Sequence, residues 1–180
     1  ATLAPGAQQK GGLDETGPYE PVESWFKPGF ERWAQPVLGV AADTPDRIFM
    51  VGGNEGSGRL GSGAIGPAGD ILDKNPARAA RDIPEAEAAQ QHHVLVLNGD
   101  GKLIEEWTQW NDLIDYSHSV AISPYDPERH VWVVDRGNNQ IHKFTNDGKT
   151  LVMSVGEKGV AGTDRGHFGA PANITFLPDG

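Results

Sequence analysis

Histidines are the side chains of this sequence best suited to chemistry, and the chain contains six of them. A neutral imidazole is a preferred ligand of zinc, which takes four ligands at structural sites and three protein ligands at catalytic sites. His118 is the leading candidate because it comes shortly before the apolar run Val120–Ile122, and a side chain at the start of a strand can reach an ion bound there. A single histidine is not a metal site, however, and His118 could instead form a hydrogen bond to a neighbouring structural unit.

The remaining histidines are better explained by structural roles. The rings of the adjacent His92 and His93 would point to opposite faces of a strand, so the two cannot readily bind one ion. His130 lies beside a turn and is expected in solvent, whereas His142 is expected on a polar face of a strand. His167 is expected to form a hydrogen bond to the backbone of its own loop.

The acidic residues also have simple structural interpretations. Asp135 ends an apolar run before a Gly-Asn-Asn turn, where a carboxylate can accept backbone N–H groups. Asp100 and Asp147 each precede glycine, which is typical of a tight hairpin turn. The neighbours Glu105 and Glu106 are expected to face solvent rather than to act as an acid–base pair. The sequence has no Gly-x-Ser-x-Gly elbow, no phosphate-loop lysine and no EF-hand pattern.

The elements that must position these side chains are short strands that recur along the chain. Residues 94–104 align without a gap with residues 141–151. The offset is roughly 47 residues, within the ~40–50 typical of propeller blades. A repeat of this kind buries its apolar face only by stacking against neighbouring copies. The sequence therefore predicts that the repeats pack side by side.

The predicted fold is an all-β propeller of which this chain covers about two and a half blades. The half blade is expected to begin at Asn173, where a third copy of the first strand starts. The strands are expected near residues 37–42, 47–52, 93–98, 102–107, 118–123, 130–135, 140–145 and 149–154.

Two segments depart from the repeat. Residues 1–36 are predicted to form an extended arm, because glycine and proline interrupt any regular element. Aromatic residues of this arm, Trp25 and Phe26 among them, should pack on the domain. Residues 37–180 form the partial propeller, with an insertion at 52–91. The glycine-rich first half of the insertion loses much entropy on ordering, so we expect a loop over one rim that is less ordered than the blades.

The second repeat carries an extended motif. It runs from Ser117–Ile122 to Val133–Ile141, and then to Phe144 and Asp147-Gly148. This pattern resembles the blade of the NHL-repeat β-propeller family, with Gln140 in place of the usual arginine. Within that family the chain is most similar to the peptidyl-hydroxyglycine amidating lyase domain.

The resemblance implies a six-bladed propeller with zinc at the mouth of its central channel, bound by three histidines at the starts of three blades. It makes His118 the first of these ligands and places the other two, with a catalytic tyrosine, beyond Gly180. The family's arginine after the second strand of the first blade has no counterpart at residues 52–55, and Arg59 is the nearest arginine. A zinc-dependent lyase is thus one hypothesis. The alternative is a non-catalytic propeller that binds a protein or small ligand on one rim, and fold alone does not decide between them.

Bulk composition narrows the partners. The formal net charge is −10, which argues against nucleic acid and against an anionic membrane surface. The chain has no cysteine, so disulfide and thiolate chemistry are excluded. No apolar run approaches the ~20 residues of a membrane span. A first residue of Ala1 is compatible with removal of a signal peptide, and we expect an extracytoplasmic location, periplasmic or secreted.

About two and a half blades cannot close a propeller, because closure pairs the last blade with the first. The apolar faces at both ends would then contact water, and exposed patches of this kind drive association. We therefore expect a continuing or second chain to supply the remaining blades, and we do not expect residues 1–180 alone to be a stable monomer. The expected ligand is a small molecule or a peptide.

Overall fold

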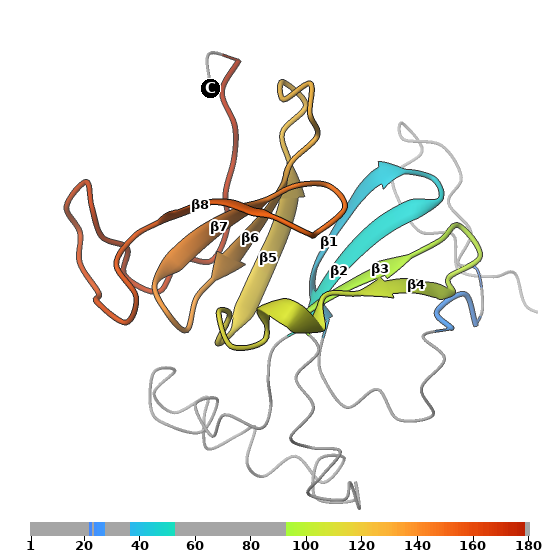
Figure 1. Ribbon diagram of the computed structural model, residues 1–180, viewed down its shortest axis with the longest axis horizontal. Helices are drawn as coiled ribbons and strands as arrows, with labels where there is room; N and C mark the ends of the chain where they lie inside the picture. Colours follow the sequence, from blue (N-terminus) through green and yellow to red (C-terminus); the bar gives the residue numbers. More distant parts are fainter. Residues whose placement is uncertain (1–21, 23, 28–36, 53–92, 179–180) are drawn as a thin grey trace, which may run out of the picture.

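The computed structural model describes residues 22, 24–27, 37–52 and 93–178, which form two four-stranded antiparallel sheets (Figure 1). Each of the eight expected strands is present, with ends within two residues of those predicted. The first sheet contains β1 (Val37–Thr44), β2 (Arg47–Gly52), β3 (Val94–Leu97) and β4 (Leu103–Glu106). The second contains β5 (Ser117–Ile122), β6 (Val131–Asp135), β7 (Gln140–Phe144) and β8 (Leu151–Val155), and the 3-10 helix η3 (Thr108–Trp110) lies between the sheets in sequence.

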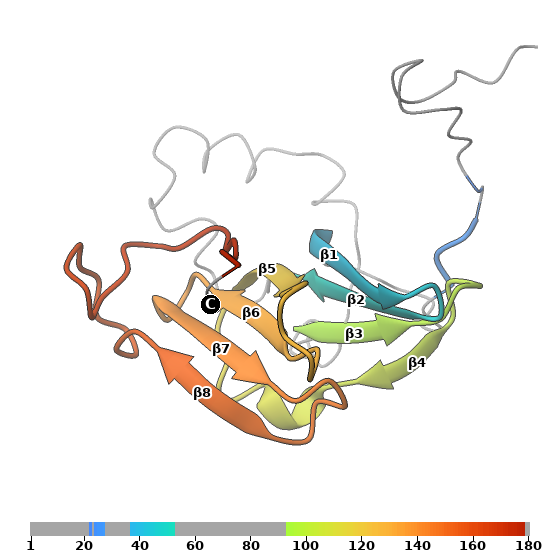
Figure 2. The ribbon, with the colours of Figure 1, turned by 90° about the horizontal axis from the view of Figure 1, so that it is seen from above.

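The two sheets are arranged as adjacent blades. In each sheet the strands follow chain order, which is the meander of a propeller blade. The first strands β1 and β5 lie side by side, and β4 and β8 lie on the outer side (Figure 2). At Gly39 an added Cβ would stand 2.9 Å from the Cα of Ser119, so the approach of these inner strands requires glycine. The predicted all-β propeller class is confirmed, and the described residues form two blades.

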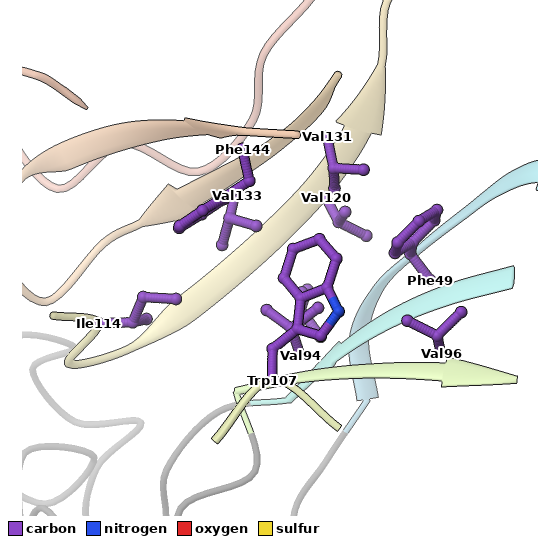
Figure 3. Packing of buried hydrophobic residues seen from close by; sticks show 10 residues of the cluster. Phe49, Val94, Val96, Trp107, Ile114, Val120, Val131, Val133 and Phe144 are labelled. Carbon is purple, nitrogen blue, oxygen red and sulfur yellow. The ribbon is translucent and has the colours of Figure 1, made fainter. Parts of the chain in front are cut away.

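The hydrophobic core lies between the blades (Figure 3). Trp107, from the connection between the sheets, sits between Phe49 of the first blade and Phe144 of the second, with ring centroids 5.6 Å from each in edge-to-face geometry. Such aromatic pairs add about 0.5–1.5 kcal/mol to the gain from burial. The valines and the isoleucine that complete this core are Val51, Val94, Val96, Ile114, Val120, Val131 and Val133.

The hairpin turns predicted at Asp100 and Asp147 are confirmed. Gly101 and Gly148 have φ values of 76° and 69°, a region that glycine enters without steric cost. The second turn also docks onto the core segment, because the Gly148 carbonyl accepts a hydrogen bond of 2.7 Å from Trp110 Nε1. The turn between β7 and β8 is therefore stabilised both by its glycine and by its hydrogen bond to Trp110.

A polar network joins the blades near these turns. Arg47 of β2 forms a two-pronged ion pair with Glu105 of β4, so Glu105, which was expected to face solvent, is partly exposed and paired. The same guanidinium donates from Nε to Asn146 Oδ1 of the second blade at 2.7 Å. Asn146 Nδ2 in turn donates to Asp43, which accepts a bond from Arg129. The network therefore joins the first and second blades by several hydrogen bonds.

The described part of the N-terminal arm packs on the first blade, on the face away from the second. Trp25 and Phe26 contact a cluster formed by Met50, Leu95 and Leu97. Trp25 Nε1 donates to the Gly99 carbonyl at 2.7 Å. The two arm aromatics are therefore partly buried against the blade, as their cost of exposure to water predicts.

The C-terminal segment runs alongside β5 without forming a strand within the described residues (Figure 1). Ser119 Oγ donates to Asn173 Oδ1 at 3.0 Å, and the Phe176 ring lies 5.9 Å from that of Trp132. This segment therefore lies next to β5 as β5 lies next to β1. The half blade predicted from Asn173 therefore stays a prediction, since the described residues form no third sheet.

The insertion expected at 52–91 lies almost wholly outside the described residues, as does Arg59. Its attachment points are described, at Gly52 in β2 and at His93 just before β3. Among the described residues, no helix is long and apolar enough to cross a membrane.

Candidate functional site

The second blade has two ends, which carry different histidines. Ser117 pairs with Asp135 at one end of the β5–β6 ladder, and Ile122 pairs with Val131 at the other. We call the first end, with His118, the His118 rim. We call the second end, formed by the connection at residues 123–130, the hairpin rim.

His118 is half-buried and is held through one ring nitrogen. Its Nδ1 lies 2.8 Å from the carbonyl oxygen of Ala172. Because a carbonyl can only accept, Nδ1 must donate its proton, so in a neutral imidazole the lone pair lies on Nε2. Hydrogen bonds from the described residues reach Nδ1 of this ring and not Nε2. A metal-bound histidine shows the same arrangement, with its other nitrogen donating to a carbonyl or carboxylate, so the ring fits a metal ligand.

The start of β5 is fixed by the residue before His118. Ser117 is fully buried, and its Oγ lies 2.6 Å from the carbonyl oxygen of Gly52 and 3.1 Å from that of His93. Gly52 is the last residue of β2, and His93 is the residue before β3. The first blade therefore anchors the strand that presents His118, and the insertion leaves the first blade at the same rim.

The Asp135 carboxylate organises the turn after β6. It is fully buried and accepts five hydrogen bonds. Burial by itself raises the pKa of this carboxyl, but the neighbouring His142 ring and the backbone donors outweigh it and hold the pKa below its ordinary value. The predicted structural role is confirmed. The donors are the backbone N–H groups of Asp115, Tyr116, Gly137 and Asn138 and the side-chain amide of Asn138.

Arg136 directly follows this carboxylate and reaches the same segment as His118. Its backbone N–H donates to the Tyr116 carbonyl at 2.9 Å. Its NH1 donates to the Ala170 carbonyl at 2.7 Å. Ala170 and Ala172 are therefore held by an arginine and by a histidine, and both side chains belong to the His118 rim. Sequence reasoning did not single out Arg136.

His167 lies in the loop that leads to this segment. It was expected to bond the loop backbone, but its ring binds two carboxylates. Nδ1 lies 2.8 Å from Asp164 Oδ1, and Nε2 lies 3.2 Å from Glu157 Oε2. Asp164 first, and then Glu157, raise the pKa of His167 above its ordinary value.

The hairpin rim carries a group that could hold a metal ion by residue type and spacing. One ligand atom from each of Asp126, Glu128 and His130 lies within 4.8 Å of the others. The His130 ring is already engaged on both sides, at 2.7 Å from Asp126 Oδ2 and 3.2 Å from Glu128 Oε2. The expectation that His130 is solvated is therefore wrong, because these contacts bury it. The alternating Asp-x-Glu-x-His spacing was a signal in the sequence that was missed.

Charge at the hairpin rim is compensated internally. Lys143 Nζ lies 3.6 Å from Asp126 Oδ2, the oxygen that also contacts the His130 ring. Burial raises the pKa of Asp126, but the hydrogen bond with His130 and that from the Glu128 backbone outweigh it, so the pKa lies below its ordinary value. The charged and hydrogen-bonding groups of this cluster therefore have partners within the cluster.

His142 is fully buried rather than on a polar face of its strand, so that expectation is also wrong. It pairs with Val133 in the ladder, on the face of the sheet that packs against the first blade. Its Nδ1 lies 2.8 Å from Ser154 Oγ. Its Nε2 lies 3.6 Å from Asp135 Oδ2, longer than a normal hydrogen bond. The ring is therefore bonded to β8 through Ser154, and its Nε2 faces the buried carboxylate without a hydrogen bond to it among the described residues.

Comparison with known proteins gives one partial relationship. No protein-family model matches the chain. A curated protein of Caenorhabditis elegans, a probable peptidyl-alpha-hydroxyglycine alpha-amidating lyase, is 31% identical over 87 residues. These residues cover 48% of this chain and 23% of that protein, so the match spans about a quarter of the relative's length. The match supports a distant relationship to that lyase family, whereas the NHL pattern rests on the sequence motif.

Proposed function

We propose that this chain is part of a metal-dependent lyase related to the peptidyl-hydroxyglycine amidating lyases, with His118 as one of the metal ligands. The observation that carries the proposal is the hydrogen bond from His118 Nδ1 to the Ala172 carbonyl. That bond sets the tautomer and orients Nε2 for a ligand. The partial similarity to an amidating lyase supplies the reaction class.

The residues around His118 would keep it in place. Ser117 ties the strand start to the first blade, and Asp135 fixes the turn beside it. A bound zinc ion supplies Lewis acidity, which lowers the pKa of a coordinated hydroxyl group. In the described part of the chain, the group of three ligating residues lies on the hairpin rim, so we propose that the partners of His118 come from outside the described residues.

The proposed substrate is a peptide that ends in α-hydroxyglycine. Cleavage of the N–Cα bond of this residue releases the peptide as its amide. The hydroxyl proton is lost as the Cα–oxygen bond becomes a carbonyl, and the amide nitrogen gains a proton. The carbon fragment leaves as glyoxylate, and the substrate hydroxyl would bind beside His118. We further propose an extracytoplasmic location and a continuing polypeptide that supplies the remaining blades.

Activity of the complete protein tests the proposal. The protein should cleave a peptide that ends in α-hydroxyglycine, lose this activity after treatment with a chelator, and regain it when zinc is restored. His118→Ala should abolish cleavage, while Arg165→Gln, a change at an exposed position of the 156–171 loop, should leave it intact. A fully active protein after complete removal of metal would refute the metal-dependent mechanism. A metal-free, inactive protein that binds a ligand on one rim would favour the non-catalytic propeller.

A further inference from the structure

We propose that Trp25 and Phe26 of the N-terminal arm form one side of the interface that closes the propeller, and that the last blade of the ring forms the other side. The last blade is the one that meets the first blade when the ring closes. This inference rests on the further blades that belong to the proposed function, but it does not depend on the lyase reaction. It gives the arm a role that the repeat motif does not explain.

The arm lies on a face of the first blade that has a counterpart in the second blade. The gapless alignment of residues 94–104 with residues 141–151 makes β3 the counterpart of β7, and the ladder registers extend the match to β2 and β6. In the second blade this face packs against the first blade. In the first blade it carries Trp25 and Phe26. The equivalent residues in the first and second blades are, in pairs, Ile48 and Val131, Met50 and Val133, Leu95 and His142, and Leu97 and Phe144.

The arm is also attached to its blade in the same way as the connection between the two blades. The described arm residues, drawn in blue, lie where β3 and β4 join, away from the second blade (Figure 1, Figure 2). Trp25 Nε1 donates to the Gly99 carbonyl in this β3–β4 turn at 2.7 Å. In the connection, Trp110 Nε1 donates to the Gly148 carbonyl in the equivalent β7–β8 turn, also at 2.7 Å. The arm therefore occupies the position of an inter-blade connection.

The glycines of the two turns show the same close approach. A Cβ at Gly101 would collide with Trp25, and a Cβ at Gly148 would collide with the ring of Trp107. The backbone N–H of Lys27 donates to the Gly101 carbonyl at 2.7 Å, so the backbone of the arm is attached as well as its side chains. Trp25 is thus the counterpart, on the first blade, of the tryptophans that begin the second blade.

The two tryptophan sites differ in what covers their far side. The Trp107 ring is 3% exposed because Phe49 of the preceding blade packs on it, whereas Trp25 is only half-buried. In the second blade Trp132 occupies the position of Phe49 in the ladder, on the face away from the first blade. Each second strand therefore offers an aromatic ring to the blade that follows it. A last blade of the same repeat would place its own large apolar side chain on the exposed side of Trp25.

Photocross-linking of the complete protein tests this closure directly. The probe is p-benzoylphenylalanine in place of Phe26, which keeps an aromatic ring at that position. We expect the cross-linked peptide to come from the last blade of the same molecule, as identified by mass spectrometry. The control places the same probe at Val152, an exposed residue of the outer strand β8, where no cross-link to the last blade is expected. A cross-link confined to the first blade, or one to a second molecule, would overturn the inference.

Hydrogen exchange of the complete protein provides the second test. Trp25→Ala should speed amide exchange about tenfold in β2, in β3 and in the last blade, and leave β5–β7 unchanged. Trp25→Phe keeps a ring but loses the bond to Gly99, so its effect should be smaller. If Trp25→Ala does not fold, Trp25→Phe and the cross-link carry the test. Faster exchange in the first blade alone would show that the arm only caps that blade, and would overturn the inference.

Neither measurement requires catalysis. An active lyase whose arm does not cross-link to the last blade would refute the closure and retain the proposed function. A cross-link to the last blade in a protein without lyase activity would refute the proposed function and retain the closure.

Discussion

The two rims of the second blade hold their histidines in different ways. At the His118 rim a backbone carbonyl binds one nitrogen of the ring, which leaves the lone pair on the other nitrogen. At the hairpin rim two carboxylates bind both nitrogens of His130. The hairpin rim has three residues of the types that bind metals, yet its imidazole is already fully used. The comparison indicates that, in judging whether a histidine can bind a metal, a ring nitrogen without a hydrogen-bond partner is more informative than the number of candidate ligands nearby.

The rims also differ in their charge. At the hairpin rim, Asp126 contacts both His130 and Lys143, so opposite charges meet within the cluster. At the His118 rim, the carboxylate of Asp135 is satisfied by amide donors, and Arg136 donates to a carbonyl. The first arrangement stabilises a loop. The second holds the C-terminal segment through the carbonyls of Ala170 and Ala172.

The largest expected effect comes from removing the buried carboxylate that supports the His118 rim. Asp135→Ala would leave several buried N–H donors without an acceptor, at a cost of about 1–3 kcal/mol for each. We expect the free energy of unfolding to fall by at least about 3 kcal/mol, measured by denaturant titration of the complete protein. Asp147→Ala, at an exposed turn, is the control and should cost much less. Equal losses in the two variants would show that the Asp135 turn does not organise this rim.

Acid should weaken the same rim. The folded-state pKa of Asp135 is lowered, so its contribution to stability is present above the ordinary carboxyl pKa and is lost as the pH falls below it. Stability should therefore decrease as the pH drops from about 5 to about 3. Amide hydrogen exchange at Tyr116 and Asn138, measured across this range, should accelerate together. Exchange that is independent of pH after correction for the intrinsic rate would contradict the assigned role of the ionised carboxylate.

At the hairpin rim we expect a moderate loss of stability and no loss of metal. His130→Ala removes a buried ring that contacts two carboxylates, and we expect it to cost about 1–3 kcal/mol in the free energy of unfolding. Calorimetric melting measures this cost. His130→Gln retains a side-chain hydrogen-bond donor and should recover part of the stability. A stability loss smaller than that of an exposed-site variant such as Asp147→Ala would indicate that the ring is solvated after all.

The smallest expected effect concerns the loop before Ala170. The pKa of His167 is raised by Asp164 and Glu157, so the stabilisation is complete below the ordinary histidine pKa and is lost as the pH rises through the raised value. Hydrogen exchange of residues 157–168 should therefore increase modestly between about pH 6 and pH 8 beyond the intrinsic rate. His167→Gln should abolish this dependence. The same pH dependence in that variant would exclude His167 as its cause.

Periodicity and turn chemistry were sufficient to predict the fold. The repeat beginning at Val94 and Ile141 located the strands, and Asp-Gly pairs located the hairpin turns. His142 was misplaced because burial on a strand depends on which neighbouring blade covers each face. His130, which precedes β6, was misplaced because it pairs with Asp126 and Glu128 of its own connection. A single strand sequence does not contain that information.

The candidate site could be predicted only in part. The place of His118 at the start of β5 followed from the motif. Its partner, the Ala172 carbonyl, and the bond between Arg136 and Ala170 join segments that are distant in sequence. Such contacts depend on how the C-terminal segment lies beside β5, which strand periodicity does not specify. The tautomer of His118 could therefore be assigned only from the structure.

The central claim, that the free nitrogen of His118 marks a metal ligand while the engaged ring of His130 does not, is tested most directly by metal stoichiometry. The complete protein and its His118→Ala and His130→Ala variants would be analysed for zinc by mass spectrometry after exhaustive dialysis. We predict about one zinc ion per molecule in the wild-type protein and in His130→Ala, and a loss of that ion in His118→Ala. Retention of zinc in His118→Ala together with its loss in His130→Ala would contradict the account and assign the metal to the hairpin rim.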